Sequence, residues 1–454
     1  MREKISKYLV VSDHTFADES GVNVQLAYAT RTAKLLFLTP RIVNALQRGD
    51  LSAIPNAILG TLRQAQAVVP EGEDELRVVL DRSRAASRAE DTVSFILLPA
   101  SYCNMGCSYC GQKHTRGGLS AEHRDGIRAR ILAAIERPTT EQVNVEWFGS
   151  EPLMGLAALR DLSADFIRAA DTAGIRYHSR IVTNGALLNE RTLERLIVEC
   201  RITHFDITLD GPPEIHDVRR PLKGGGGSFW RIVGTVGEAA RRYRHVTFSF
   251  RTNVDSGNRE HVVRFLGLMA EQGFDQPNVV FDMARVRPWS NDVSEVEISM
   301  RDFAVREQEW LRVMNNEGLG FNVLPTRTGK VVCPAVDAHS ELISPTGNIF
   351  SCTDHPLVPE SEATEALAHI SDRTLLPLRP KGRYDDWQDD VQAGKSWCRG
   401  CVFLPTCGGS CPKAWHEGNP PCPSYKFNIQ TRLDLVAERC NLSVLDLGLT
   451  PSEA

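Results

Sequence analysis

The sequence has 454 residues, a length that is enough for two or three folded domains. Of these residues, 42% are hydrophobic and 24% are charged. Its formal net charge of −5 gives no surplus of basic residues, so nucleic acid is excluded as an expected partner. No stretch approaches the ~18 apolar residues of a membrane span, and the first residues lack a secretory signal. We therefore expect a cytoplasmic protein with no membrane partner.

Residues 1–85 are predicted to form a small β/α domain. Residues 8–38 contain three short β segments separated by turn-forming residues. Residues 40–49 and 53–69 have the apolar spacing of helices, and the second of them leads into a short strand. The polar run "DRSRAASRAEDT" at 81–92 is interpreted as a linker to the next domain.

From residue 92 the sequence alternates strands with helices. Strands are predicted at 93–99, 142–148, 177–183, 203–209, 245–254 and 278–284. Helices are predicted at 121–137, 157–173, 189–199, 229–243, 258–272 and 299–316. Six β/α units predict a parallel sheet over 92–318, either doubly wound or an incomplete (β/α) barrel.

Unusual polar motifs follow five of these strands. They are the cysteine group at 103–110, "GSEP" at 149–152, "TNG" at 183–185, "LDGPPEIHD" at 209–217 and "RTNVD" at 251–255. In both candidate architectures, ligands bind where the carboxyl ends of the strands meet. The five motifs are therefore expected to lie together at one rim.

The first motif places three thiols, Cys103, Cys107 and Cys110, within eight residues and offers no fourth nearby. A structural zinc site needs four ligands. A [4Fe–4S] cluster also normally takes four cysteines, so three would leave one iron open to another ligand. The alternative is that these are buried thiols with a chance spacing.

The Cys-x3-Cys-x-aromatic-Cys element, met here as Cys103, Cys107, Tyr109 and Cys110, resembles the signature of the radical S-adenosylmethionine (SAM) superfamily. The resemblance implies an α/β fold with a partial (β/α)6, TIM-like barrel. It also implies a [4Fe–4S] cluster whose open iron binds SAM. Electron transfer to SAM would produce a 5′-deoxyadenosyl radical that abstracts hydrogen from a substrate.

The other rim motifs extend this resemblance. "GSEP" is similar to the Gly-Gly-Glu-Pro element that receives the methionine amino group, with serine in place of the second glycine. The implied SAM contacts are Tyr109, Gly149, Ser150, Glu151, Thr183, Asn184 and Asp210, the last three on the ribose side, and Arg251 at the SAM carboxylate. Singly, such motifs are more often turns or surface charges, so the prediction depends on their order along the strands.

Residues 319–427 are rich in Cys, Gly and Pro. The seven cysteines are Cys333, Cys352, Cys398, Cys401, Cys407, Cys411 and Cys422. Their spacing resembles the SPASM extension of peptide-modifying radical SAM enzymes, which implies two auxiliary [4Fe–4S] clusters and hence three clusters in all. By that pattern Cys333, Cys352 and Cys411 hold the inner cluster, and the other four hold the outer one. Zinc sites that stabilise a small module are the alternative.

The inner set again has only three cysteines. Asp337, His339 or Cys440 are candidates for a fourth ligand, and an open site is a further possibility. His339 is otherwise expected at the surface, and Cys200 and Cys440 are otherwise expected to be buried in helices. Residues 428–454 are predicted to form a C-terminal helix and tail.

The first 85 residues resemble the winged-helix-like precursor-recognition element of peptide maturases, which binds a leader peptide by extending its sheet. A purely structural cap is the alternative. We therefore predict an enzyme that modifies a ribosomal precursor peptide, for example by a thioether, ether or carbon–carbon crosslink, with a reducing partner such as flavodoxin or ferredoxin. The alternatives are a protein maturase of the sulfatase-maturating kind, an enzyme of a small metabolite, and a non-catalytic, zinc-stabilised binding module.

Overall fold

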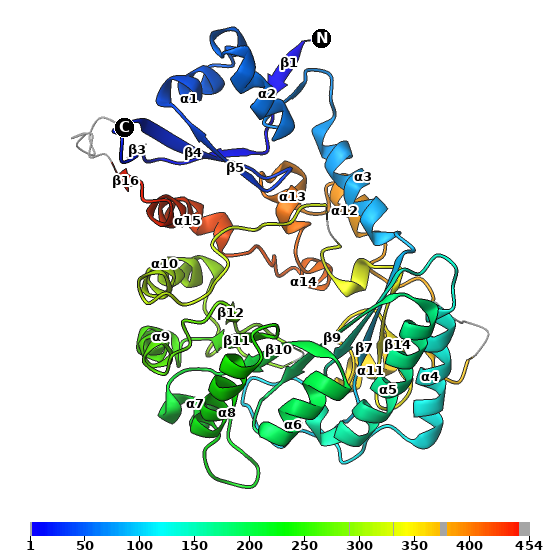
Figure 1. Cartoon of the computed structure of the whole chain (residues 1–454). Helices are drawn as coiled ribbons and strands as arrows, with labels where there is room; N and C mark the ends of the chain where they lie inside the picture. The colour runs from blue at the N-terminus through cyan, green and yellow to red at the C-terminus, as the bar shows by residue number, and fades with distance from the viewer. Residues whose placement is uncertain (1, 290, 330, 373–378, 445–454) are drawn as a thin grey trace. The chain divides into compact units, whose positions relative to one another are not determined.

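The computed structural model describes residues 2–289, 291–329, 331–372 and 379–444 (Figure 1). The chain divides into two compact units. The first comprises Met1–Ser87, Val323–Val332 and Asp386–Ala454, and the second comprises Arg88–Asn322 and Cys333–Asp385. The segment 319–427, predicted as one cysteine-rich domain, is thus divided between the two units.

The described part of the second unit contains a nine-stranded sheet of order β12-β11-β10-β9-β8-β7-β13-β14-β15. Its first six strands in chain order are parallel: β7 (Thr92–Leu97), β8 (Gln142–Trp147), β9 (Arg176–Thr183), β10 (Ile202–Thr208), β11 (Thr247–Val254) and β12 (Val279–Arg285). All six strands predicted from the sequence are present. Because neighbours follow chain order without a reversal, the doubly wound alternative is wrong.

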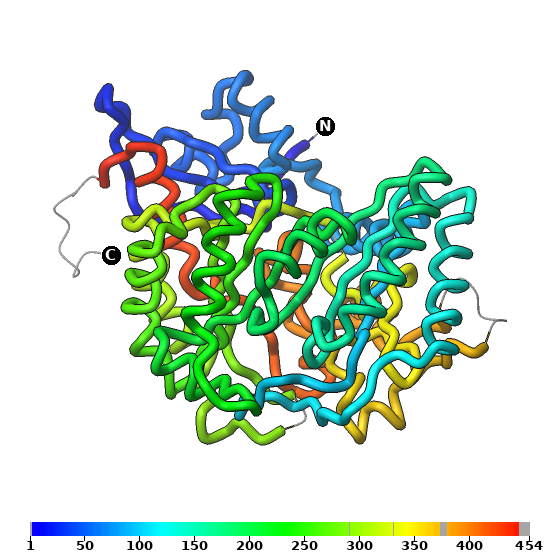
Figure 2. The backbone as a smooth tube through the Cα atoms, turned by 60° about the horizontal axis from the view of Figure 1, so that its bottom comes forward, coloured from blue at the N-terminus to red at the C-terminus, as the bar shows by residue number. Residues whose placement is uncertain are grey.

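Helices cover one face of these parallel strands (Figures 1 and 2). They are α4 (Ala121–Ile135), α5 (Leu156–Ala173), α6 (Glu190–Glu194) with the π-helical η3 (Arg195–Glu199), α7 (Pro213–Arg219), α8 (Phe229–Arg242), α9 (Val262–Glu271), which follows the 3₁₀ turn η4 (Arg259–His261), and α10 (Met300–Asn316). Strand β8 shows why: Val143, Val145 and Trp147 are buried, whereas the alternating Asn144 and Glu146 are only partly buried. One face of the sheet is therefore apolar and the other is polar.

The rest of the second unit extends the sheet beyond β7. Strand β13 (Ser340–Ile343) runs parallel to β7, and β14 (Asn348–Phe350) and β15 (Ala368–His369) continue antiparallel. The 3₁₀ turns η2 (Pro152–Gly155) and η5 (Pro334–Val336) and the short helix α11 (Pro359–Thr364) complete its described elements. The segment with Cys333 and Cys352 therefore packs as part of this sheet.

The first unit begins with a small sheet and two helices. Strand β4 (Asn23–Ala29) pairs with β5 (Lys34–Leu38) on one side and with β2 (Leu9–Val11) and β3 (Phe16–Ala17) on the other. Helices α1 (Pro40–Gln47) and α2 (Asn56–Gln64) pack on this sheet through Val43, Leu46 and Leu62. Strand β1 (Glu3–Ile5) pairs with β6 (Val68–Pro70), η1 (Leu51–Ala53) is a 3₁₀ turn, and β3 also pairs with β16 (Ser443–Val444).

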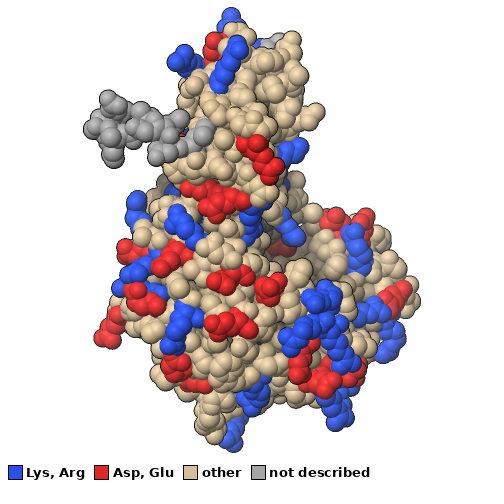
Figure 3. Space-filling view, turned by 60° about the vertical axis from the view of Figure 1, so that its left-hand side comes forward, with Lys and Arg blue, Asp and Glu red and all other residues tan. Residues whose placement is uncertain are grey.

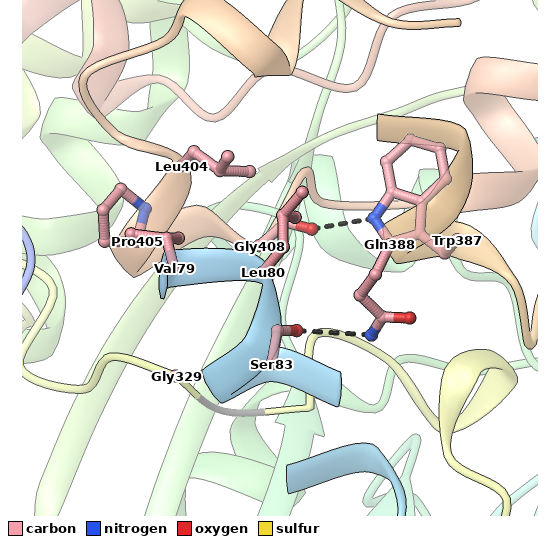
Figure 4. A pocket seen from close by; sticks show the side chains of 9 residues that line it. All are labelled: Val79, Leu80, Ser83, Gly329, Trp387, Gln388, Leu404, Pro405 and Gly408. Atoms are coloured by element: carbon pink, nitrogen blue, oxygen red, sulfur yellow. Dashed lines mark hydrogen bonds between the residues drawn. The ribbon is translucent and has the colours of Figure 1, made fainter. Parts of the chain in front are cut away.

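Half of the predicted linker is helical instead. Helix α3 spans Glu75–Ser87, because Val79 and Leu80 give it a buried face and Arg84 forms an ion pair with Asp81. Figure 4 shows this face opposite Trp387, with the Gln388 side-chain amide donating to Ser83 Oγ over 3.3 Å. The polar composition that suggested a linker belongs to the exposed side of the helix.

The cysteine-rich part of the first unit consists of short helices: α12 (Trp387–Gln392), the 3₁₀ turn η7 (Trp397–Gly400), α13 (Leu404–Cys407) and α14 (Pro412–His416). The final helix, α15 (Tyr425–Arg439), begins before the predicted residue 428 and bends at Asn428.

The surface carries both signs of charge. On the face drawn in Figure 3, basic and acidic side chains are interspersed, which agrees with the balanced composition. Among the described residues, no helix combines the length and apolarity needed to cross a membrane.

Candidate functional site

Cys103, Cys107 and Cys110 lie on one loop that follows β7. A bridge between Met105 and Leu222 fixes this loop, and the Met105 amide donates to Cys103 Sγ over 3.4 Å. Burial raises the pKa of Cys103 to about 11 and also raises the pKa of Cys107 and Cys110. Without a bound cation the three thiols would stay protonated, and a bound metal is what would stabilise their thiolates.

Tyr109 anchors the same loop through its hydroxyl group. This hydroxyl donates to Asp210 Oδ2 over 2.5 Å and accepts hydrogen bonds from Arg220 and, over 3.2 Å, from Asn253 Nδ2. Asp210 is fully buried and also accepts from the Asn253 amide over 3.0 Å. The aromatic position of the cysteine motif is therefore tied to the loop that follows β10 and to the carboxyl end of β11.

Sequence reasoning missed Arg220. Its positive charge opposes the effect of burial on the pKa of Cys107, which places a cation beside the cysteine loop. Burial, with smaller contributions from Arg220 and Arg219, lowers the pKa of His216 on the same segment to about 3. The available signal was the "EIHDVRR" run at 214–220, which begins within the Asp210 motif, belongs to α7 up to Arg219 and places Arg220 at the C-cap of that helix.

Glu151 joins the loops that follow β8 and β9. Its buried carboxylate accepts hydrogen bonds from Thr183 Oγ1 over 2.7 Å, from the Asn184 amide over 2.8 Å and from the Leu153 amide over 3.0 Å. Burial raises the pKa of Glu151, and these three donors oppose that shift. Glu151 therefore positions the neighbouring loops.

Asn184 carries this link on to the cysteine loop. Its side-chain amide donates to Asn104 Oδ1 over 2.8 Å and to Cys103 Sγ over 3.6 Å. The motifs after β7, β8 and β9 are therefore connected by hydrogen bonds, as their order along the strands predicted.

Gly149 and Ser150 follow β8, and the first matters for its backbone conformation and the second for its hydroxyl group. Gly149 has φ +100°, and a Cβ atom there would lie 2.5 Å from Leu98 Cγ, so this position requires glycine. Ser150 Oγ is buried and has no hydrogen-bond partner among the described residues. An unpartnered buried hydroxyl suits a ligand that supplies the missing hydrogen bond, so the serine is compatible with a bound amino group.

Arg251 lies within β11, three residues before its carboxyl end, with its side chain 47% exposed. It contacts Asp282 over 3.3 Å and Asn253 Oδ1 over 3.2 Å. Arg251 is thus the half-exposed cation among the predicted SAM contacts. A guanidinium group of this kind can bind a carboxylate.

Four cysteines of the first unit share one small cavity. Cys398, Cys401, Cys407 and Cys422 line it together with aromatic side chains such as Trp397. Burial raises the pKa of Cys398 to about 11 and that of Cys407 to about 12, and Lys426 Nζ donates to Cys422 Sγ over 3.5 Å. This set of four thiols, of which Cys398 is buried and the other three are partly buried, matches the ligand number of a [4Fe–4S] cluster.

Among the described residues, no three His, Cys, Asp or Glu side chains lie close enough together to hold one metal ion. A preformed mononuclear zinc site is therefore not seen there. The thiolates of a cluster stand farther apart than those around zinc, because each binds a different iron. None of the twelve cysteines forms a disulfide.

The predicted inner set is divided between units, with Cys333 and Cys352 in the second and Cys411 in the first. His339 is only 7% exposed, so its expected surface position is wrong. Burial raises the pKa of Asp337 to about 6, and its carboxylate accepts from the His339 amide over 2.9 Å.

The two isolated cysteines differ from each other. Cys200 is buried, as expected. Cys440 is exposed, because it lies at the C-cap of α15, where the helix ends, and the expectation that it is buried is wrong.

Two sulfatase-maturating enzymes are similar in sequence to this chain. The serine-type anaerobic sulfatase-maturating enzyme of Bacteroides thetaiotaomicron is 22% identical over 342 residues, covering 68% of this chain and 80% of that enzyme. The cysteine-type enzyme of Clostridium novyi is 25% identical over 189 residues, covering 40% of this chain and 49% of that enzyme.

Solved structures share the fold. The structure of anSMEcpe with bound AdoMet and Kp18Cys peptide matches with a TM-score of 0.58 and 17% identity, covering 77% of this chain and 98% of that one. The sequence profile of the radical SAM superfamily matches residues 97–269, which include the cysteine loop and the motifs after β8 to β11. Residues 97–269 of this chain are therefore similar to the radical SAM domain.

Proposed function

We propose that this chain is a radical SAM/SPASM maturase that modifies a ribosomally synthesised peptide. The observation that carries the proposal is the hydrogen-bonded rim that joins the three-cysteine loop to Glu151, Asn184 and Asp210. Cys103, Cys107 and Cys110 would hold the SAM-binding [4Fe–4S] cluster. With SAM bound, that cluster supplies a radical able to abstract a hydrogen atom from the substrate.

The residues of the chain would bind and orient SAM. Ser150 Oγ, which lacks a partner in the described structure, is our candidate contact for the methionine amino group. Arg251 is the candidate for the carboxylate, because half of its side chain is exposed. The polar groups of Thr183, Asn184 and Asp210 already bond to the protein, so any ribose contact of theirs would use their remaining capacity.

We assign Cys398, Cys401, Cys407 and Cys422 to an outer auxiliary cluster, because all four line one cavity. Cys333, Cys352 and Cys411 would hold an inner one. Its fourth ligand is Asp337, His339, Cys440 or a group of the substrate. A flavodoxin or ferredoxin would supply the electrons.

A peptide partner is supported by the fold of the first unit. Strand β5 pairs only with β4 among the described residues, so its other edge has backbone groups free to pair with an added strand. Phe37 on β5 is 47% exposed, which gives that edge an apolar contact. The edge of β5 is our candidate for leader-peptide binding by β-augmentation.

The second candidate is a maturase acting on a protein of the sulfatase kind, which the two curated relatives favour. Against it, the anSMEcpe structure is covered over 98% of its length but leaves nearly a quarter of this chain unmatched. An additional peptide-recognition domain would account for this unmatched part of the chain. A sulfatase maturase of the anSMEcpe kind would not need it.

One incubation distinguishes the candidates. The reconstituted protein is incubated anaerobically with SAM, a reductant and either a peptide encoded beside its gene or a sulfatase-derived peptide, and the peptides are analysed by mass spectrometry. We expect a mass change in the first peptide only. A change in the sulfatase peptide alone would favour the second candidate, and no 5′-deoxyadenosine in either reaction would count against both.

A further inference from the structure

A cavity of about 360 Å3 lies in the second unit, and Asn144 and Glu146 of the partly buried face of β8 are among the residues that line it. This volume is within the ~300–1,000 Å3 that is usual for ligand pockets. Its lining includes Ser94, Asn144 and His178 from the amino-terminal and middle parts of β7, β8 and β9. The rim residues described above, from the cysteine loop to Asp210, are not among the residues that line this cavity.

Glu146 lines the cavity with unused acceptor capacity. Its carboxylate lies 3.4 Å from Arg180 Nε and makes no hydrogen bond to another described residue. Arg180 is in closer contact with Asp206, which His204 also contacts over 3.3 Å. The charge of Arg180 therefore compensates Asp206 first and Glu146 only in part. Burial raises the pKa of Glu146, as expected for an incompletely compensated carboxylate.

Ser340 is a second incompletely bonded group in the cavity wall. It lies on β13 opposite Ser94 of β7, and it is only 1% exposed. Its Oγ atom has no hydrogen-bond partner among the described residues. Because buried hydroxyls in folded proteins are normally hydrogen-bonded, this atom points to a ligand group in the cavity.

The charges of the cavity select the class of that ligand. Glu146 and Arg180 are the acidic and basic residues of the lining, and Asp206, which does not line the cavity, pairs with Arg180 and offsets its positive charge, so the charge of Glu146 is left largely uncompensated. A cation would compensate the remaining charge, whereas a carboxylate would add to it. A ligand ammonium or guanidinium group also supplies the donors that Glu146 lacks.

We propose that this cavity binds a lysine or arginine side chain of the peptide substrate, with Glu146 as its counter-ion. The inference deepens the proposed function and rests on it only in taking the substrate to be a peptide. Asp206 acts as a positioning residue, because it holds Arg180 and so leaves Glu146 available.

The test is calorimetric titration of the cluster-reconstituted full chain with three probes. These are the Nα-acetyl N-methylamides of lysine, norleucine and glutamate, which differ in side-chain charge. The variants are Glu146→Gln and Asp206→Asn. Glu141→Gln is the matched control, because Glu141 lies one residue before β8 with its side chain 71% exposed.

We expect the wild-type chain to bind the lysine probe at least tenfold more tightly than the norleucine probe. Glu146→Gln and Asp206→Asn should reduce this preference to less than about threefold, and Glu141→Gln should keep it. Equal binding of all probes, tighter binding of the glutamate probe, or an equal loss in Glu141→Gln would overturn the inference. If Glu146→Gln does not fold, as judged by circular dichroism, Asp206→Asn and the wild-type probe series decide.

The reaction is tested separately in the same preparation by 5′-deoxyadenosine formation from SAM and reductant. Normal formation with equal probe binding would overturn this inference alone. A lysine preference without 5′-deoxyadenosine would overturn the proposed reaction alone.

Discussion

Replacing Tyr109 by phenylalanine removes one hydroxyl group and leaves the aromatic ring in place. That hydroxyl donates to Asp210 and accepts from Arg220 and Asn253. Because Asp210 is fully buried and Arg220 nearly so, water does not readily replace the lost partner. We therefore expect the loop after β10 and the carboxyl end of β11 to open more often in this variant.

The magnitude follows from the charges of the partners. Hydrogen bonds to charged groups contribute about 1.5–3 kcal/mol each, and two of the three partners are charged. Asp210 Oδ2 and Arg220 Nη1 are already 3.9 Å apart, so they can approach each other and recover part of the loss. We expect a net cost of about 2 kcal/mol, which is roughly a 30-fold increase in local opening.

Hydrogen–deuterium exchange measures this opening. The peptide covering residues 248–256 contains the Asn253 amide, which donates to Asp210 Oδ1. Tyr102→Phe is the matched control, because Tyr102 directly precedes Cys103 and the variant keeps the ring against which Lys223 Nζ lies at 4.6 Å. Unchanged exchange in Tyr109→Phe, or equally faster exchange in Tyr102→Phe, would refute the anchoring role of Tyr109.

Three further changes test other parts of the structure. Arg130→Met leaves the buried Glu341 without its ion-pair partner and should lower the free energy of unfolding by about 3–5 kcal/mol in urea titrations, whereas Arg201→Met, at an exposed pair, should leave it nearly unchanged. His216 has a pKa of about 3 in the folded chain against 6.5 in the unfolded one, so the unfolded chain binds more protons between these values and stability falls as the pH drops below about 6.5. His216→Gln should lose about 1 kcal/mol less than the wild type between pH 7 and 5.5 in the same titrations, and an equal loss would contradict this. Cys401→Ala should lose about four irons by chemical analysis and still form 5′-deoxyadenosine, and loss of that activity would contradict the assignment of Cys401 to an auxiliary cluster.

Periodicity predicted the six parallel strands well, because buried strands and amphipathic helices impose different spacings on the sequence. The run at 81–92 misled, since its polar residues lie on the exposed side of α3 while Val79 and Leu80 are buried. Composition alone does not separate a linker from a surface helix, and only the buried turn before the run gave the difference.

The rim motifs were found because chain order and the common edge of a parallel sheet determine where they lie. Arg220 was missed because its role depends on how the end of α7 turns this C-cap residue toward Tyr109, which no local pattern specifies. Glu146 was missed for the same reason. Alternation on β8 places it on the polar face, but its weak pairing follows from the competition between Asp206 and Glu146 for Arg180.

The most direct measurement of the central claim is 5′-deoxyadenosine formation by the reconstituted chain with SAM and a reductant under anaerobic conditions. We predict that the wild-type chain forms it and that Cys107→Ala does not, although Cys107→Ala should keep the iron of its auxiliary clusters. A wild-type chain that holds at least about four irons and forms none, or a Cys107→Ala variant that forms as much as the wild type, would contradict the account.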